Sequence, residues 1–98
     1  MWEFGKDQEA MEHVDKAIDA DERFAEAWYN KGFFMNERGL PDQALYCLDN
    51  AISLGYHGVE VLEEKLRACD GIGDYEEEER VRIEIQKIVE REGMEMIG

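Results

Sequence analysis

The stretch AEAWYNKGFFMNERG, residues 25–39, decides how this chain folds. Its composition favours a helix, yet Gly32 lies in the middle of the run and Gly39 at its end. A glycine inside a helix costs roughly 1 kcal/mol relative to alanine. Its neighbours are the bulkiest side chains of the stretch, Trp28, Tyr29, Phe33 and Phe34. A glycine at this position could be required for ligand binding, for a reaction or for close packing of helices.

The composition predicts one helical domain. The chain has 98 residues, enough for a single modest core, and contains only one proline. No apolar run approaches the roughly 20 residues that cross a bilayer. The N-terminus lacks the basic start and apolar middle of a signal peptide. We therefore expect a soluble, cytoplasmic protein without a membrane partner.

The charge is strongly acidic. The chain has 11 Lys and Arg against 25 Asp and Glu, which gives a formal net charge of −14. Nucleic acid and anionic lipid both require positive charge near their phosphates. We therefore expect no nucleic-acid partner, and basic or neutral proteins or peptides as partners instead.

The residues that carry enzyme chemistry do not form any known pattern. Cys47 and Cys69 are far apart and form no CxxC pair. His13 and His57 have no second ligand at metal-binding spacing. The segment 19–22 lacks the glycine and closing glutamate of a calcium loop. Nucleophile-base pairs and phosphate-binding loops are also missing. We predict no metal, no cofactor and no enzymatic activity.

The sequence repeats itself with a period of 34 residues. Shifting residues 5–18 by 34 gives five identities, which are Gly5 with Gly39, Ala10 with Ala44, Asp15 with Asp49, Ala17 with Ala51 and Ile18 with Ile52. Both segments place small and large apolar residues in the same order on one helical face. A second shift matches Glu26 with Glu60, Lys31 with Lys65 and Gly39 with Gly73. Beyond Gly73 the apolar stripe returns at an offset of 37, as Val81, Ile85, Ile88 and Val89.

Glycine and proline divide the chain into predicted helices. The breaks are Gly39 to Pro41, Gly55 to Gly58 and Gly71 to Gly73. We predict about five helices, at 6–20, 25–38, 41–54, 59–71 and 74–91, with a frayed tail after Gly93. Connections this short force neighbouring helices to pack antiparallel.

Two helices per repeat, with these small and aromatic positions, resemble the tetratricopeptide repeat (TPR) family. The positions that carry the resemblance are Trp28, Gly32, Gly39, Ala44 and Ala51. Lys31, Tyr56 and Leu66 depart from the family pattern. The resemblance implies an all-α, antiparallel helix-pair solenoid that forms one domain over residues 1–98. Its parts are a half repeat at 5–24, the best-matching repeat at 25–58, a divergent repeat at 59–92 and a tail at 93–98.

Close packing explains the glycine in this arrangement. Gly32 would face Ala44 across the helix pair, and Ala51 would admit the first helix of the next pair. A larger residue at position 32, such as leucine, should therefore destabilise the fold by a few kcal/mol.

The resemblance also implies a scaffold whose first helices line a concave, peptide-binding groove. Helical phase assigns to this groove the residues Glu26, Tyr29, Phe33, Asn36, Glu37, Glu60, Glu63, Arg67 and Asp70. The lysine and asparagine clamp of some family members is not reproduced. The residues indicate an acidic groove with an aromatic floor, suited to a segment with Lys or Arg among apolar residues. The alternative is that these positions simply face solvent, although neighbouring aromatics are less expected there than glutamates.

The ends of the chain suggest a second function. The half repeat at 5–24 would leave the apolar face of Met11, Val14 and Ile18 without its usual cover. Trp2 and Phe4 could fold over it, a second copy could cover it, or the chain could be a fragment of a longer TPR array. A self-associating structural module is therefore the alternative function. The far end should be closed by a polar face made of Glu84, Lys87, Glu90 and Arg91.

Overall fold

The computed structural model describes residues 4–56 and 58–97, with side chains described for residues 8–56 and 58–92. All regular elements in these residues are α-helices, which confirms the all-α prediction. They are α1 (Phe4–Ala20), α2 (Ala25–Glu37), α3 (Pro41–Ser53), α4 (Val59–Ile72) and α5 (Tyr75–Ile97). The predicted tail after Gly93 is wrong, since α5 continues to Ile97.

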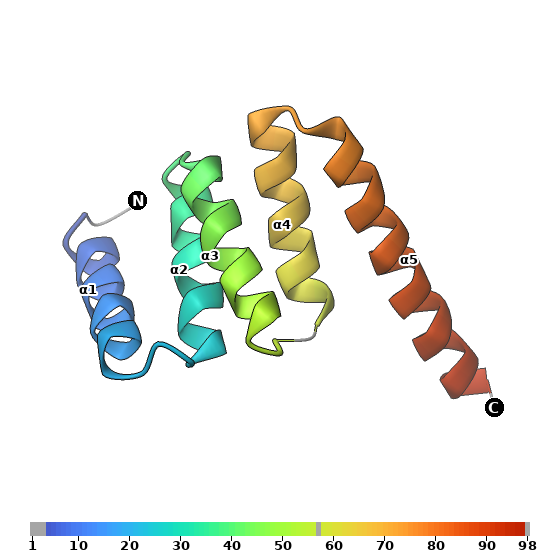
Figure 1. The fold of residues 1–98 in the computed structure, drawn as a ribbon, viewed down its shortest axis with the longest axis horizontal. Helices are drawn as coiled ribbons and strands as arrows, with labels where there is room; N and C mark the ends of the chain where they lie inside the picture. The colour runs from blue at the N-terminus through green and yellow to red at the C-terminus, as the bar shows by residue number, and fades with distance from the viewer. Residues whose placement is uncertain (1–3, 57, 98) are drawn as a thin grey trace.

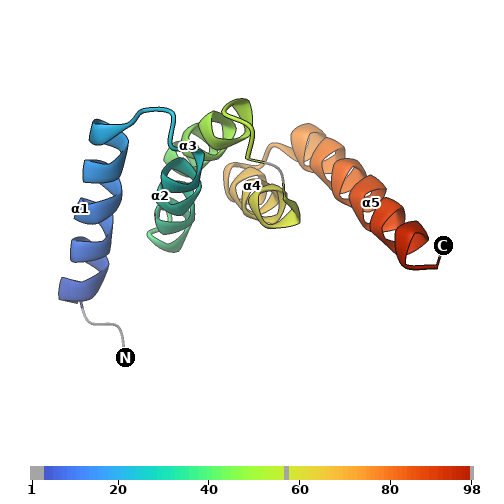
Figure 2. The ribbon, with the colours of Figure 1, turned by 90° about the horizontal axis from the view of Figure 1, so that it is seen from below.

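The helices follow one another as an antiparallel row (Figure 1). Each helix packs against the next one in the chain. In addition, α2 contacts α4, although α3 separates them in the sequence. In Figure 2 the row forms an arch, with α3 on its outer side and α2 and α4 on its inner side. The contact between α2 and α4 therefore creates an inner surface from helices that are separated by α3.

The turn between α4 and α5 shows how the sequence sets a helix boundary. Gly73 has a φ of 78°, a left-handed conformation that favours glycine. This conformation lets the Asp74 N–H donate to the carbonyl of Cys69 at 3.0 Å, which closes α4. The Asp74 side chain then accepts a hydrogen bond from the Glu77 N–H at 3.2 Å and caps α5.

The core is centred on α3. Ala44, Leu48 and Ala51 are completely buried between α2 and α4. The core cluster consists of Met11, Met35, Ala44, Leu48, Ala51, Val61, Leu62, Ala68 and Val81. Apolar side chains from all of the helices thus meet along the stripe that the sequence repeats.

Gly32 marks the closest approach of α2 to α3. A Cβ atom on Gly32 would lie 2.6 Å from Cδ2 of Leu48 and 3.3 Å from the carbonyl oxygen of Ala44. Atoms this close cannot coexist without movement of a helix or a side chain. The glycine in the opening stretch is therefore explained by packing, as the sequence predicted.

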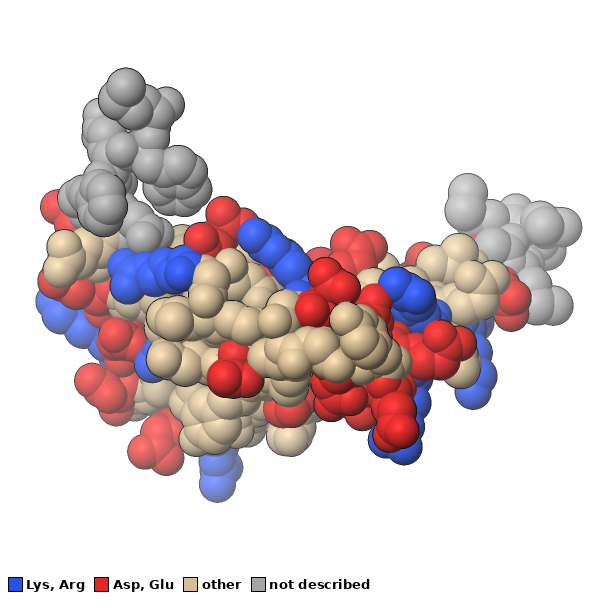
Figure 3. Space-filling model, turned by 90° about the horizontal axis from the view of Figure 1, so that it is seen from above, with Lys and Arg blue, Asp and Glu red and all other residues tan. Residues whose placement is uncertain are grey.

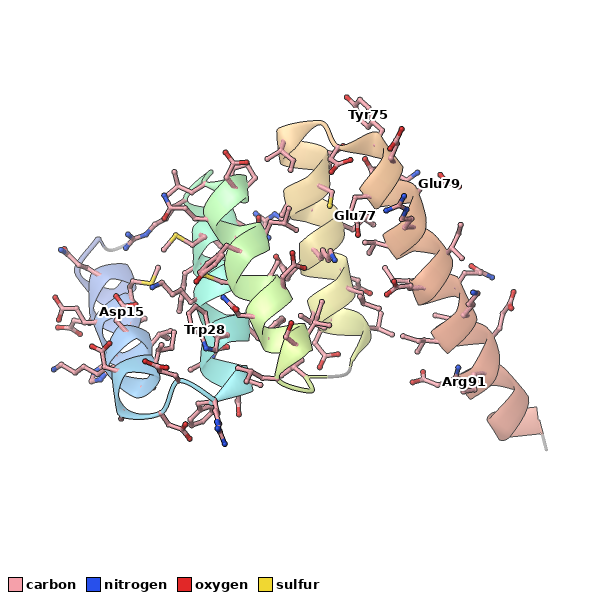
Figure 4. All side chains as sticks on the ribbon, in the orientation of Figure 1. Asp15, Trp28, Tyr75, Glu77, Glu79 and Arg91 are labelled. Atoms are coloured by element: carbon pink, nitrogen blue, oxygen red, sulfur yellow. The ribbon has the colours of Figure 1, made fainter. Side chains whose placement is uncertain are left out.

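An ion pair recurs with the 34-residue period. Lys31 Nζ lies 2.9 Å from Asp15 Oδ1 and joins α2 to α1. At the equivalent positions one period later, Lys65 Nζ lies 3.0 Å from Asp49 Oδ1 and joins α4 to α3. Lys65 also lies 3.3 Å from Glu77 of α5, which Figure 4 labels between α4 and α5. The repeated identities therefore correspond to one repeated contact.

The N-terminal apolar face, for which the sequence left three possible covers, is largely buried. Met11 and Ile18 are buried, and Val14 is half-buried. The side chains of Trp2 and Phe4 lie outside the described residues. The structure therefore offers no exposed stripe of Met11, Val14 and Ile18 for self-association at this edge.

The C-terminal end is only partly closed. Glu84, Lys87, Glu90 and Arg91 are exposed, as predicted. However, Ile83 and Val89 are also 48% and 51% exposed. Val89 was expected in the apolar stripe, but α5 has 23 residues whereas α4 has 14, so the later part of α5 extends past its neighbour (Figure 1).

Candidate functional site

The inner side of the arch brings together most of the residues that the sequence assigned to a groove. We call it the α2–α4 surface. It consists of Glu26, Tyr29, Phe33 and Glu37 of α2, Tyr56 before α4, and Glu60, Glu63, Glu64 and Arg67 of α4. The contacts described below connect its two helices, which pack against each other directly.

Two stacked tyrosines form the centre of this surface. The rings of Tyr29 and Tyr56 are 5.0 Å apart between centroids and inclined by only 11°. The Tyr56 hydroxyl donates a hydrogen bond to Glu60 Oε1 at 3.3 Å. Tyr29 is half-buried, not exposed as expected, because Tyr56 covers one of its faces.

Carboxylates surround the tyrosine pair. Burial raises the pKa of Tyr29, and the negative charges of Glu64, Glu60 and Glu63 raise this pKa further. Burial also raises the pKa of Tyr56, together with the charge and hydrogen bond of Glu60. Both phenols therefore sense a negative potential, to which the carboxylates of α4 contribute. This potential would attract a cation that approaches the pair.

Phe33 extends the aromatic surface by one helical turn. It follows Tyr29 at a spacing of four residues and is therefore on the same side of α2. The Phe33 side chain is 36% exposed and meets Phe34 edge-to-face, with centroids 5.9 Å apart. Phe34 packs against the core, so Phe33 rests on a fixed support. Of the two predicted aromatics, Phe33 is thus the more accessible.

The one predicted cation of the surface is already paired. Arg67 Nη1 donates to Glu37 Oε1 at 2.7 Å and lies 3.7 Å from Glu64 Oε2. The hydrogen bond with Glu37 raises the pKa of Arg67 above its ordinary value. This pairing ties α4 to α2 and offsets the positive charge of Arg67. Arg67 is therefore not a free positive charge on this surface.

Asn36 does not face an open groove, which corrects the prediction. It is only 9% exposed. Its Nδ2 donates to the backbone carbonyl of Glu64 at 3.0 Å and to Glu64 Oε2 at 2.8 Å. Asn36 is therefore a buried link between α2 and α4. The remaining predicted residues, Glu26, Glu60, Glu63 and Asp70, are exposed.

Sequence reasoning missed Tyr56 and Glu64. Tyr56 lies in a connection, where helical phase gives no direction, and Glu64 lies beside the predicted Glu63. A usable signal was nevertheless present. Tyr56, Glu60 and Glu64 are spaced by four residues, which is the spacing of one side of a helix. The phase of Glu60 within α4 would have included Glu64, whereas Tyr56 lies before the helix begins.

The described residues hold no group of three metal-ligating side chains that could bind a metal ion. None of the described helices is long and apolar enough to cross a membrane. Figure 3 shows the end of the molecule that holds the α2–α3 and α4–α5 connections, with acidic and basic side chains around a neutral area. The α2–α4 surface combines acidic side chains with aromatic rings.

Comparison of the chain with protein-family models and with curated proteins found no match in either case.

Proposed function

We propose that the chain is a TPR-like scaffold that binds a basic segment of a partner protein on its α2–α4 surface. Two features support a helix-pair solenoid. The ion pairs Asp15–Lys31 and Asp49–Lys65 occupy positions related by the 34-residue period. The direct contact between α2 and α4 is also typical of stacked helix pairs, in which alternate helices line one side.

The stacked pair of Tyr29 and Tyr56 among carboxylates carries the binding proposal. A Lys or Arg side chain of the partner would be attracted by Glu26, Glu60 and Glu63, which are exposed near the rings. The neighbouring apolar surface of Phe33 suits an apolar residue of the same segment. Because Arg67 is held by Glu37, it does not oppose the approach of a positive partner.

The proposal concerns recognition, and it requires neither a cofactor nor a reaction. Charge complementarity of this kind mainly accelerates association and selects partners, while the aromatic contacts supply burial. Its electrostatic part should weaken as salt shortens the range of the interaction, to about 8 Å at physiological ionic strength.

A library of fluorescent peptides with Lys or Arg between apolar residues provides the test. We expect saturable binding that weakens with added salt. The Tyr29→Ala/Phe33→Ala variant should lose about tenfold or more in affinity, since aromatic anchors dominate such interfaces. The Glu60→Gln/Glu63→Gln variant should keep weaker binding with a much smaller salt dependence.

Tyr75→Ala is the matched control. Tyr75 is 72% exposed at the start of α5, outside the α2–α4 surface, and points away from the row of helices in Figure 4. Its replacement should leave peptide affinity unchanged. If the Tyr29→Ala/Phe33→Ala variant bound the selected peptides as well as the control, the α2–α4 surface would not be the binding site.

A further inference from the structure

A separate cavity lies between α2 and α3. Its volume is about 380 Å³, and its lining residues are Trp28, Lys31, Asp42, Gln43, Tyr46 and Cys47. None of these residues belongs to the α2–α4 surface. The volume is within the range of small-molecule binding sites, about 300–1,000 Å³. The cavity is therefore large enough for a compact ligand or for one side chain of a partner.

Two aromatic rings form a corner in this cavity. The centroids of Trp28 and Tyr46 are 6.0 Å apart, and their planes are inclined by 80°. The Trp28 Nε1–H donates to the carbonyl of Glu22 at 2.9 Å, which fixes the orientation of the indole. Tyr46 remains 66% exposed, although it is a large aromatic residue. A group placed in the angle between the rings would contact both of them.

The charges around the corner favour a cation. The one basic residue of the lining, Lys31, has its Nζ 2.9 Å from Asp15 Oδ1 of α1, so its charge is offset. Figure 4 shows Asp15 and Trp28 on the neighbouring helices α1 and α2. Asp42 adds a carboxylate to the lining, and the whole chain carries a formal charge of −14. The net negative charge of the chain therefore attracts a cation from a distance, and the carboxylate of Asp42 attracts it within the cavity.

The rest of the lining is suited to methyl groups. Cys47 is 3% exposed, and burial raises the pKa of its thiol, so the sulfur is a neutral, weakly polar wall. The stem of Lys31 is apolar up to its ion-paired end. A simple ammonium keeps a tight hydration shell, whereas an alkylated ammonium spreads its charge over methyl groups that can contact apolar walls.

We propose that the cavity between α2 and α3 binds an alkylated ammonium group in the corner formed by Trp28 and Tyr46, with Asp42 as its counter-ion. Quaternary ammonium groups bind in protein sites of this kind through the negative faces of aromatic rings. Such a group occurs on small amines related to choline and on the trimethylated lysine of a protein. The ligand is thus distinct in chemistry and location from the basic segment of the proposed function.

Choline and its neutral analogue 3,3-dimethylbutan-1-ol provide the first probe pair, because they share a shape and differ in charge. The chain contains two tryptophans, so a Trp2→Phe background makes Trp28 the only indole reporter. We expect a saturable change in Trp28 fluorescence with choline and no saturation with the alcohol. The proposal would be overturned by equal responses to the two compounds. It would also be overturned if neither choline nor a trimethyllysine peptide gave a saturable response.

Variants of the exposed residues then locate the site. Tyr46→Ala should weaken choline binding by about tenfold or more, and Tyr46→Phe should retain it, since only the ring face is required. Asp42→Asn should weaken binding without removing it. Circular dichroism would verify that each variant keeps its helices. Full affinity in Tyr46→Ala, with the helices intact, would contradict the assignment.

The two sources of the group are separated by peptides. Trimethyllysine and unmodified lysine peptides of identical sequence are titrated beside choline. Binding of both choline and the trimethyllysine peptide supports a protein ligand, and binding of choline alone supports a small amine. Phe33→Ala is the control on the α2–α4 surface, and it should leave choline affinity unchanged. Failure of the peptide groove would therefore not affect this result.

Discussion

The substitution Gly32→Ala tests the contact on which the row of helices depends. The added Cβ would lie 2.6 Å from both Cγ and Cδ2 of Leu48, and 3.3 Å from the carbonyl oxygen of Ala44. Leu48 is completely buried, so its side chain has little space into which it can move. The carbonyl belongs to the backbone of α3. Accommodation of one methyl group therefore requires α2 and α3 to separate.

Two opposing terms set the size of the effect. Alanine is favoured over glycine inside a helix by roughly 1 kcal/mol, and this term stabilises the variant. Overpacking of a well-packed core costs about 1–3 kcal/mol. Because the nearest atoms are in the fully buried Leu48, we expect the upper part of this range. The net result for Gly32→Ala is a destabilisation of about 1–2 kcal/mol.

The same change should reverse its sign when Leu48 is alanine. Leu48→Ala alone leaves a cavity and should cost about 2–5 kcal/mol. It also removes the two atoms that would collide with the new methyl group. In this background Gly32→Ala should be neutral or stabilising by up to about 1 kcal/mol. The two positions should therefore couple by about 1–3 kcal/mol.

Urea unfolding of the four proteins, followed by far-ultraviolet circular dichroism, measures this cycle. The Leu48→Ala series is best measured at low temperature with the same protein concentration throughout. If Gly32→Ala stabilised both backgrounds equally, position 32 would behave as an ordinary solvent-facing helix position. The close approach of α2 to α3 would then be refuted.

Two further predictions concern polar links between helices. Asn36→Ala removes the amide that donates to two oxygens of Glu64, and should destabilise the fold by about 1–3 kcal/mol in urea unfolding. Asp70→Ala, at an exposed position, should change stability by no more than about 0.5 kcal/mol, and equal losses would contradict the role of Asn36. For Lys65, burial lowers the pKa, but two carboxylate partners outweigh it and raise the pKa above 10.5. This stabilisation is present below the ordinary lysine pKa and is lost as the pH rises through the raised value. Above about pH 10.5, the urea midpoint of the wild type should therefore fall more steeply with pH than that of Lys65→Met. If the urea midpoints of the wild type and Lys65→Met fell in parallel with pH, the stabilising role of the Lys65 ion pairs would be contradicted.

The helix boundaries at the connections could be predicted because they depend on neighbouring residues, whereas the end of α5 at Ile97 was not predicted. Pro41 starts α3 and Gly73 ends α4 through their own backbone preferences. The stripe of Ala44, Leu48 and Ala51 likewise carries its own period. The small residue at position 32 was equally informative, because only a close neighbour explains a glycine beside large aromatics. Local chemistry thus determined which residues form helices and which sides they bury.

The accessibility of the site could not be predicted in the same way. Helical phase correctly directs Asn36 toward α4, but it does not reveal that the helices approach closely enough to bury the amide. Tyr56 lies in a connection without a period, and its stacking on Tyr29 depends on the path of that connection. The exposure of Val89 could be predicted only from the relative lengths of α4 and α5, which place it beyond the end of α4. These features all depend on contacts between separate helices.

Composition determines the sign of the surface charge, whereas the fold determines where this charge lies. Each ion pair, such as those of Lys31 and Arg67, neutralises one acidic charge with one basic charge. Pairing therefore leaves the excess of 14 negative charges unchanged, whichever partners meet, and composition alone predicts a positive partner. Composition does not place that excess. The fold supplies the placement, because it brings Glu60 and Glu63 of α4 near the stacked ring of Tyr29, where negative charge and aromatic surface coincide. A positive segment would therefore meet both negative charge and aromatic contact on the α2–α4 surface.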